Sequence, residues 1–296
     1  MVQAPFDEEL QPEQRTQTAI TLSELIIKIA THIICHTLVD NQEQLKEERV
    51  SIALAFLQRV TTTHMCNHKL TAEGIVYEFN GQSFQLHEEY KATTLTRSAY
   101  EHLVMFYFLY EHPKTPAERD MVWKYWQLCS KNSLLDYHAA GDADGQRQLQ
   151  EEIETLRNEM LSTPIGRQCY HKLDEWTKIG THPSNGSIEF FVNNGNYDVR
   201  RVSYSQAWRY LFANEDMMLL YRHLSLHSHP VYNGLLQYQY QSLNDQGDDG
   251  IPLHISSSIL AYLCQLFLKL VPHGDDILKQ SFSLHEQRIL RAMARL

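Results

Sequence analysis

The chain has 296 residues, of which 43% are hydrophobic and 21% charged, and these proportions exclude an intrinsically disordered protein. Only 12 glycines and 9 prolines occur, and this scarcity of turn-forming residues favours long helices over a fold of many strands. The net charge is −10 with histidine neutral, so a polyanion binder is not indicated unless the chain carries a local basic patch.

Cysteine usage and the apolar runs indicate the compartment. The five cysteines are scattered, odd in number and without a CxxC pair, so they favour a reducing compartment over a disulfide framework or a zinc ribbon. The acidic N-terminus does not resemble a signal peptide. The most apolar run, Ile259 to Val271, contains Lys269 and, at about 13 residues, is too short for a membrane span. We therefore expect a cytoplasmic protein without membrane contact.

The first predicted elements are two helices. Residues 1–17 are polar and are expected to form a solvated lead-in. Thr21-Leu-Ser-Glu24 has the spacing of a capping box and precedes an apolar helical run over residues 25–39. A second helix is expected at about 42–62. We assign this helical pair to an N-terminal segment, residues 1–70, that packs on the core.

A β-hairpin and a buried helix come next. Asn80-Gly81 lies between alternating apolar residues, which predicts a hairpin near residues 75–86. The helix predicted over about 87–111 contains the near-continuous apolar stretch Leu103 to Tyr110. Because this helix is apolar on most sides, we expect it to be the central buried helix.

Three further helices are predicted in the middle of the chain. Thr115-Pro116-Ala-Glu118 is a second capping box, so a helix is expected from there to about residue 139. The charged segment 142–160 has apolar residues at every third or fourth position, which is typical of a hairpin arm or a partner-facing helix. The third helix is expected at about 165–179.

Residues 180–202 are rich in glycine and asparagine, and we expect an ordered loop there, with short strands or one helical turn as alternatives. Helices are then predicted at about 204–213, 215–228 and 254–271, and from Asp275 to the C-terminus. The last helix carries Arg288, Arg291 and Arg295 beside apolar residues. This pattern indicates either a docked helix with a basic C-terminal end or a contact for a partner, a second copy or RNA.

One short segment has a chemical character of its own. Helical spacing places Tyr221, Arg222, Ser225 and His229 on one stripe just before Pro230 ends the helix. A histidine at a helix C-terminus can act as a general acid or base, and an arginine can hold an anion. Equally, Ser225 and His229 could bond the last helical carbonyl groups while Tyr221 packs in the core.

The pattern Tyr-x-x-Leu-Ser-x-x-x-His-Pro, from Tyr221 to Pro230, resembles a motif of a family of uncharacterised bacterial helical proteins. Those proteins carry an earlier Arg-x-x-x-Glu on a long apolar helix, and Arg97 and Glu101 have that spacing here. The resemblance covers about residues 85–270. It implies one buried polar cluster formed by Arg97, Glu101, Tyr221, Ser225 and His229. Arg97 and Glu101 could also simply pair with each other.

A second resemblance is to the HEPN superfamily of helical proteins, many of which are metal-independent ribonucleases. Their signature is an arginine followed a few residues later by a histidine, which Arg222 fits with either His227 or His229. The helical positions favour His229, because Arg222 and His229 are nearly eclipsed whereas His227 lies about 140° away. The resemblance implies that His229 acts as general acid or base and that Arg222 stabilises the phosphate.

Two histidine groups have the spacing of incomplete metal sites. The first is His32 and His36 beside Cys35, and the second comprises His64, Cys66 and His68. The sequence identifies no further ligand for either group, so histidines of the core or the surface are the preferred interpretation. No phosphate-binding loop, dinucleotide-binding or hydrolase-elbow motif occurs. We expect no metal and no cofactor.

The patterns together predict an all-α fold, a multi-helix bundle with one minor β-hairpin near residues 75–86. The main helical domain is expected to span residues 71–296, and the whole chain is expected to form one compact unit. The long helices of the bundle are those predicted near 87–111, 116–139, 204–228 and 254–271.

Two functions stay open at this point. The first is a binding, interaction or regulatory module in a bacterial defence or regulatory context, with a protein partner or a second copy of the chain. The second is a HEPN-like ribonuclease, as in toxin–antitoxin systems, that binds RNA and uses Arg222 and His229. Substrate and oligomeric state do not follow from the sequence.

Overall fold

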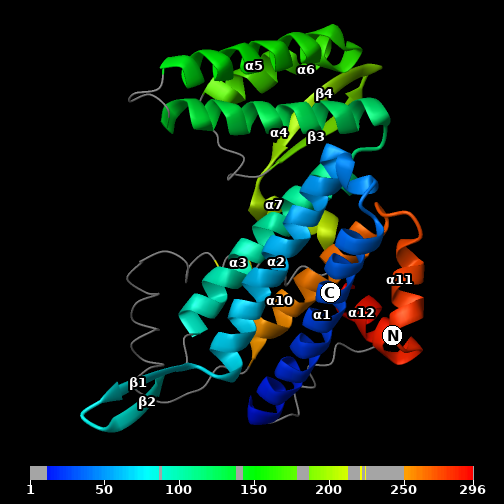
Figure 1. The fold of residues 1–296 in the computed structure, drawn as a ribbon. Coiled ribbons are helices and arrows are strands. Elements are labelled where there is room, and N and C mark those ends of the chain that lie inside the picture. The colour runs from blue at the N-terminus through cyan, green and yellow to red at the C-terminus, as the bar shows by residue number, and fades with distance from the viewer. Residues whose placement is uncertain are drawn as a thin grey trace. The chain divides into compact units, whose positions relative to one another are not determined.

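The computed structural model describes residues 12–86, 89–137, 143–178, 187–212, 221, 224 and 250–295. They are mostly helical, and the predicted all-α class is confirmed (Figure 1). The chain forms two compact units. The first unit combines Met1–Leu103 with Trp208–Leu296, and the second spans Val104–Ala207. The predicted division of the chain into residues 1–70 and 71–296 stays a prediction.

The first unit is built around the helix α10 (Ile251–Leu268), which is buried along nearly its whole length. It packs most extensively against α1 (Pro12–Asp40) and α2 (Glu48–Ala72), and these two helices also pack against each other. The helix α3 (Glu89–Phe106) reaches both α2 and α10 through side-chain contacts. The predicted N-terminal pair is therefore part of the core, since α1 buries Ile26, Ile29 and Ile33 at helical spacing.

The hairpin predicted near residues 75–86 is confirmed as β1 (Ile75–Phe79) and β2 (Gln82–Leu86), which pair antiparallel. At its turn, Asn80 and Gly81 have φ angles of 52° and 76°. This left-handed conformation at both positions is what a two-residue hairpin turn requires, and asparagine and glycine adopt it at the lowest cost.

The second unit contains α4 (Pro116–Tyr137), α5 (Ala143–Ser162) and α6 (Pro164–Lys178), with α5 packed on both neighbours. The predicted capping box at the start of α4 is confirmed, because the Glu118 amide donates to Thr115 Oγ1 at 3.1 Å while Glu118 Oε2 accepts from the Thr115 amide at 3.3 Å. A short π-helical turn, Tyr107–Glu111, follows α3. The helix α4 thus belongs to the second unit, whereas α10 belongs to the first.

A second hairpin completes this unit. The strands β3 (Ser187–Asn193) and β4 (Asn196–Val202) pair antiparallel within the segment that we expected to be a loop with short strands as one alternative. Asn194 and Gly195 form its turn with φ angles of 49° and 79°. The described residues therefore contain two hairpins where we expected one, although the same Asn-Gly signal was present in the sequence. The short helix α7 (Tyr204–Leu211) follows.

Two predicted helix ends were wrong. The first helix begins at Pro12, and the Thr21 hydroxyl donates to the carbonyl of Gln17, four residues back, instead of capping a helix. The C-terminal helix is divided into α11 (Gly274–Ser281) and α12 (Leu284–Met293). Ser283 caps α12 with a complete capping box to Glu286, and the chain bends where this box begins.

Two helices among the described residues are long and apolar enough to cross a membrane by length and composition alone, namely α10 and residues 13–40 of α1. The apolar window of α10 is 83% buried within the fold, as is usual for the core helix of a soluble protein. The window on α1 is 33% buried and lies near the N-terminus. Because core helices and signal sequences pass the same test, these two helices are weak evidence for a membrane span.

Candidate functional site

Arg97 and Glu101 form an ion pair on α3. Arg97 Nε donates to Glu101 Oε1 at 2.8 Å, and the two side chains are 21% and 26% exposed. Tyr100 and Leu103, on the same helix, are buried. The pair therefore lies at the edge of the buried face of α3, where charges are partly withdrawn from water but solutes can still reach them.

Tyr221 lies beside this pair, although it is more than a hundred residues away in the sequence. The Arg97 guanidinium carbon is 5.9 Å from the centre of the Tyr221 ring, and the Tyr100 ring is 5.1 Å from the same ring. Burial, followed by the neighbouring Tyr221 and Glu101, raises the pKa of Tyr100 well above its ordinary value. The structure thus places Arg97, Glu101 and Tyr221 together, and we call these three residues the α3 cluster.

The other predicted site residues lie outside the part of the chain that the structure describes. They are Arg222, Ser225 and His229. Leu224, which the structure does describe, is helical and only 2% exposed.

A buried polar network that the sequence did not predict lies at the centre of the first unit. His64 on α2 is fully buried, with its Nδ1 2.7 Å from Ser256 Oγ on α10 and its Nε2 3.0 Å from Ser23 Oγ on α1. His68 Nδ1 lies 2.9 Å from the same Ser23 hydroxyl. Burial lowers the pKa of His64 to about 3, so its ring is neutral at ordinary pH.

Asn67 extends this network to α3. Its side-chain amide donates to Thr96 Oγ1 and to Ser256 Oγ, both at 2.9 Å, and Thr96 Oγ1 in turn donates to the carbonyl of Pro252. The hydrogen bonds join four helices at one level of the bundle, which fixes their register. Since His64 and Asn67 are both 0% exposed, we interpret the network as structural.

Neither predicted histidine group forms a metal site among the described residues, where no group of three histidine, cysteine, aspartate or glutamate side chains converges. His64 and His68 bind the Ser23 hydroxyl, and Cys66 is exposed. A run of three serines, 256–258, in the most apolar helix was the sequence signal for the buried network, because buried hydroxyl groups require polar partners.

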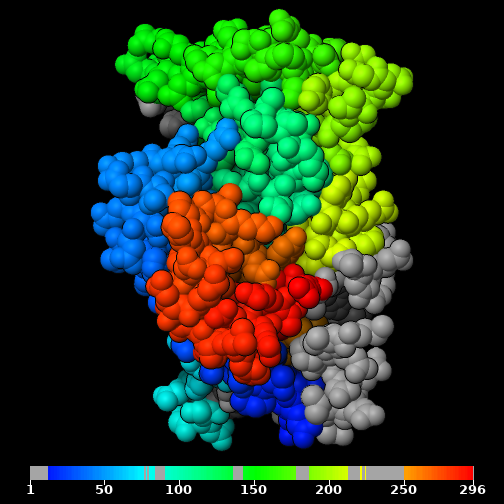
Figure 2. All heavy atoms as spheres, turned by 90° about the vertical axis from the view of Figure 1, so that its right-hand side faces the viewer, coloured from blue at the N-terminus to red at the C-terminus, as the bar shows by residue number. Residues whose placement is uncertain are grey.

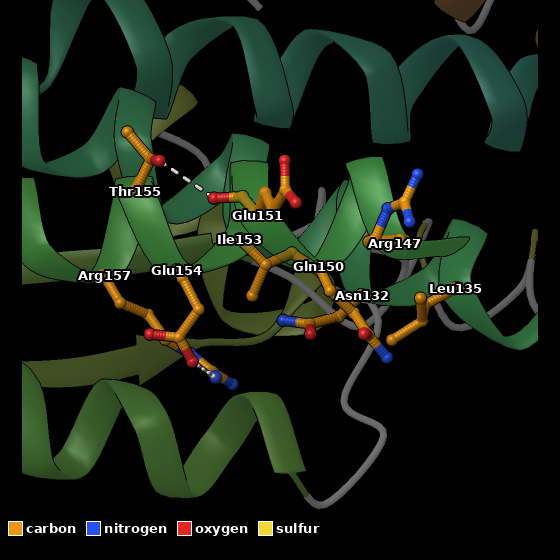
Figure 3. A pocket seen from close by; sticks show the side chains of 9 residues that line it. All are labelled: Asn132, Leu135, Arg147, Gln150, Glu151, Ile153, Glu154, Thr155 and Arg157. Carbon is orange, nitrogen blue, oxygen red and sulfur yellow. Dashed lines mark hydrogen bonds and ion pairs between the residues drawn. The ribbon is translucent and has the colours of Figure 1, made fainter. Parts of the chain in front are cut away.

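A surface depression in the second unit is a weaker candidate, and Figure 3 shows the residues that line it. It is open to solvent and is lined by residues of α4 and α5, among them Asn132, Arg147 and Arg157. Arg157 is paired with Glu154 at 3.5 Å, and Arg147 is paired with Asp144 at 3.0 Å. Both arginines of the depression thus already have a carboxylate partner, and the depression favours no particular ligand.

The part of the chain that matches a known family includes the α3 cluster. The model of a Family of unknown function (DUF5677) matches residues 85–249, more than half of the chain. The chain belongs to this family. Arg97, Glu101 and Tyr221 lie inside the matched range, whereas His64 and Ser256 lie outside it. No curated protein and no solved structure matched the chain.

Membership of DUF5677 confirms the expectation of an uncharacterised family. The individual motifs and the HEPN similarity stay predictions, because the family description names no activity. Within the DUF5677 range, the α3 cluster joins two distant segments through charged and aromatic side chains, and it is our candidate functional site.

Proposed function

We propose that this DUF5677 protein is a binding module whose ligand site is the α3 cluster, to which we add Ser225 and His229 on the strength of the sequence pattern alone. The supporting observation is the position of Arg97, held by Glu101 at 2.8 Å and by the Tyr221 ring at 5.9 Å. A partly buried ion pair adds little net stability, because desolvation offsets most of the attraction between its charges. A role in recognition would give this ion pair a function beyond its small contribution to stability.

The ligand class that fits these side chains is a small oxyanion. A guanidinium held in one orientation can bind two oxygen atoms of an anion at once. The hydroxyl groups of Tyr221 and Ser225 and a ring nitrogen of His229 would add further donors. Glu101 orients Arg97 and limits the site to ligands that compete with a carboxylate for the guanidinium.

The test is a calorimetric titration with inorganic phosphate as the probe. We expect binding to wild type, about tenfold weaker binding to Arg97→Lys, which keeps the charge but loses the planar fork, and no detectable binding to Arg97→Gln. Arg119→Gln is the matched control, because Arg119 is an exposed arginine of α4. Equal affinity in wild type and Arg97→Gln, or no binding by wild type, would refute the proposal.

The alternative function is a metal-independent ribonuclease, which rests on Arg222 and His229. An assay of RNA cleavage in EDTA distinguishes the ribonuclease from the binding module. The assay compares wild type with His229→Ala. Cleavage by wild type that disappears in His229→Ala would replace the binding module by the enzyme. Absence of cleavage in both proteins would leave the binding module in place.

The proposal includes a cytoplasmic location and a protein partner or a second copy of the chain, within a bacterial defence or regulatory context. The net charge of −10 and the near-complete burial of α10 support a soluble module. Fractionation of cells would test the location, since recovery of the protein with the membranes would contradict it.

A further inference from the structure

The outer face of α12 carries a stripe of exposed side chains. Leu284, Arg288 and Arg291 are exposed residues of α12 at steps of four and three residues, so they lie within about 60° of each other around the helix, and the exposed Arg295 follows in the turn after Met293. The opposite face buries Leu290 and Met293. We call the four exposed residues the arginine stripe. Figure 2 shows the C-terminal helices, in orange and red, at the surface.

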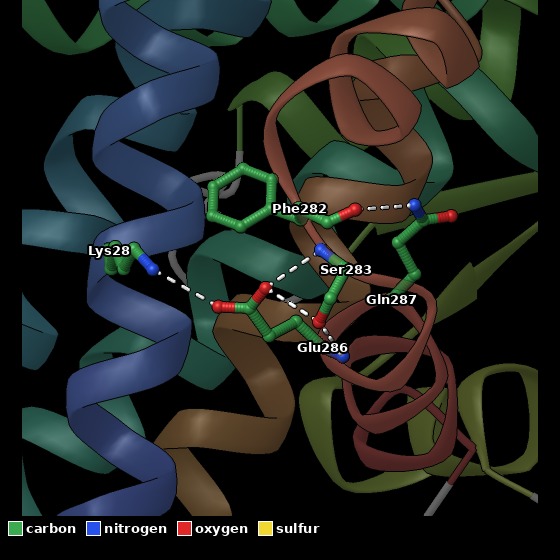
Figure 4. A network of polar contacts seen from close by, with 5 residues as sticks. All are labelled: Lys28, Phe282, Ser283, Glu286 and Gln287. Carbon is green, nitrogen blue, oxygen red and sulfur yellow. Dashed lines mark hydrogen bonds and ion pairs between the residues drawn. The ribbon is translucent and has the colours of Figure 1, made fainter.

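The helix that carries this stripe is firmly anchored (Figure 4). Lys28 on α1 donates to Glu286 Oε1 at 3.0 Å, while Glu286 Oε2 accepts from the backbone and the hydroxyl of Ser283, both at 2.8 Å. Farther along, the Gln265 side chain donates to the carbonyl of Leu290 at 3.1 Å. The backbone of α12 is therefore already ordered, and binding of a partner to the stripe would not have to order it.

The positive charge of the stripe is not matched locally. Among the residues that the structure describes, no carboxylate pairs with Arg288, Arg291 or Arg295, whereas Lys28 and Lys279 each pair with one. Arginines in the last turn stabilise the negative end of a helix, but Arg288 lies in the middle of α12, where this effect is small.

We propose that the arginine stripe is a docking surface for a short acidic segment of a partner protein. Each guanidinium can bind a carboxylate with two parallel hydrogen bonds. Leu284, which is 60% exposed at one end of the stripe, would pack against an apolar side chain of the same segment.

The chemistry of the stripe favours an acidic peptide over a nucleic acid. A long polyanion meets the repulsion of the whole acidic chain, whereas a short segment experiences mainly the local field of three arginines. The exposed Leu284 also has no counterpart in contacts to a phosphate backbone.

The test uses fluorescence anisotropy of a short labelled peptide in which glutamates alternate with leucines. We expect the triple variant Arg288→Gln, Arg291→Gln, Arg295→Gln to bind it at least about tenfold more weakly than wild type, and Leu284→Ser about threefold more weakly. The matched control replaces three exposed arginines of other helices, Arg59→Gln, Arg119→Gln and Arg167→Gln, and should bind like wild type.

Four results would overturn the proposal. They are no binding by wild type, equal losses in both triple variants, equal binding of a single-stranded RNA of the same charge, and peptide binding that occurs only after residues 1–11 are deleted. The last result would assign the stripe to the acidic start of the same chain. Phosphate binding at Arg97 is a separate measurement, so this proposal and the proposed function can fail independently.

Discussion

At the residue scale, the buried His64 makes a direct prediction about stability. Its ring bonds Ser23 on α1 and Ser256 on α10, so His64→Leu leaves two buried hydroxyl groups with fewer partners. We expect the free energy of unfolding to fall by about 3 kcal/mol, as is usual when a buried hydrogen-bond network is broken. Urea unfolding measures this difference.

The control for this variant is His171→Leu, because His171 is exposed on α6. Its free energy of unfolding should change by less than about 0.5 kcal/mol. Equal losses in the two variants would contradict a structural role for the His64 network.

The α3 cluster and the His64 network also show which residue contacts can be predicted from a sequence. A pairing of Arg97 with Glu101 was one of two alternatives from the sequence, because residues four apart on a helix are neighbours, and the structure shows this pair. Their approach to Tyr221 was expected only from the resemblance to other proteins. The contact between His64 and Ser256 spans 192 residues and depends on how α2 meets α10, which local patterns do not determine.

At the scale of elements, the start of α12 depends on the capping box of Ser283 and Glu286. Ser283→Ala removes the hydroxyl that accepts from the Glu286 amide, and we expect it to cost about 1 kcal/mol of helix stability. Hydrogen exchange of the α12 amides should become about fivefold faster. Ser281→Ala, in an exposed position at the end of α11, is the control, and unchanged exchange in both variants would refute this role of Ser283.

A helix start could be predicted from the sequence where a capping box was the only local signal and no continuous helical pattern ran through it. Thr115 and Ser283 cap helices with the same pattern, yet only the first was predicted, because the apolar positions around Ser283 permit one continuous helix. Thr21 has the pattern without the function, since the helix already begins at Pro12. A capping box is therefore informative only when the preceding residues cannot continue a helix.

At the scale of the whole molecule, buried histidines predict sensitivity to acid. Burial lowers the pKa of His64 to about 3 and of His254 to about 4, and it also lowers the pKa values of His102 and His112. These rings resist protonation when folded, so below about pH 6.5 the unfolded chain binds more protons and the folded state loses stability. For His64 and His254 this loss continues down to about pH 4 and below.

We therefore expect the melting temperature to fall as the pH is lowered from 7.5 to 5. Each fully buried histidine contributes up to about 1.4 kcal/mol per pH unit in this range. The variant His64→Gln, which has no titrating ring, should show a shallower fall than wild type. A melting temperature that rises toward pH 5 would contradict the account.

The arrangement of the whole chain was the least predictable property. Helix periodicity identified most elements, but the assignment of α4 to a different unit from α10 depends on long-range packing. The apolar face of α1 could equally have covered an existing bundle or formed part of it. The structure shows that α1 forms part of the bundle, because α1, α2 and α10 approach one another closely around Ser23, His64 and Ser256.

The central claim is that the α3 cluster binds a small oxyanion through Arg97. The most direct test follows the arginine Nε–Hε signals by nuclear magnetic resonance while inorganic phosphate is added, with the Arg97 signal assigned from its absence in Arg97→Lys. The account predicts that the Arg97 signal moves and saturates while that of the exposed Arg119 stays in place. An Arg97 signal that does not move, or arginine signals that all move together, would contradict it.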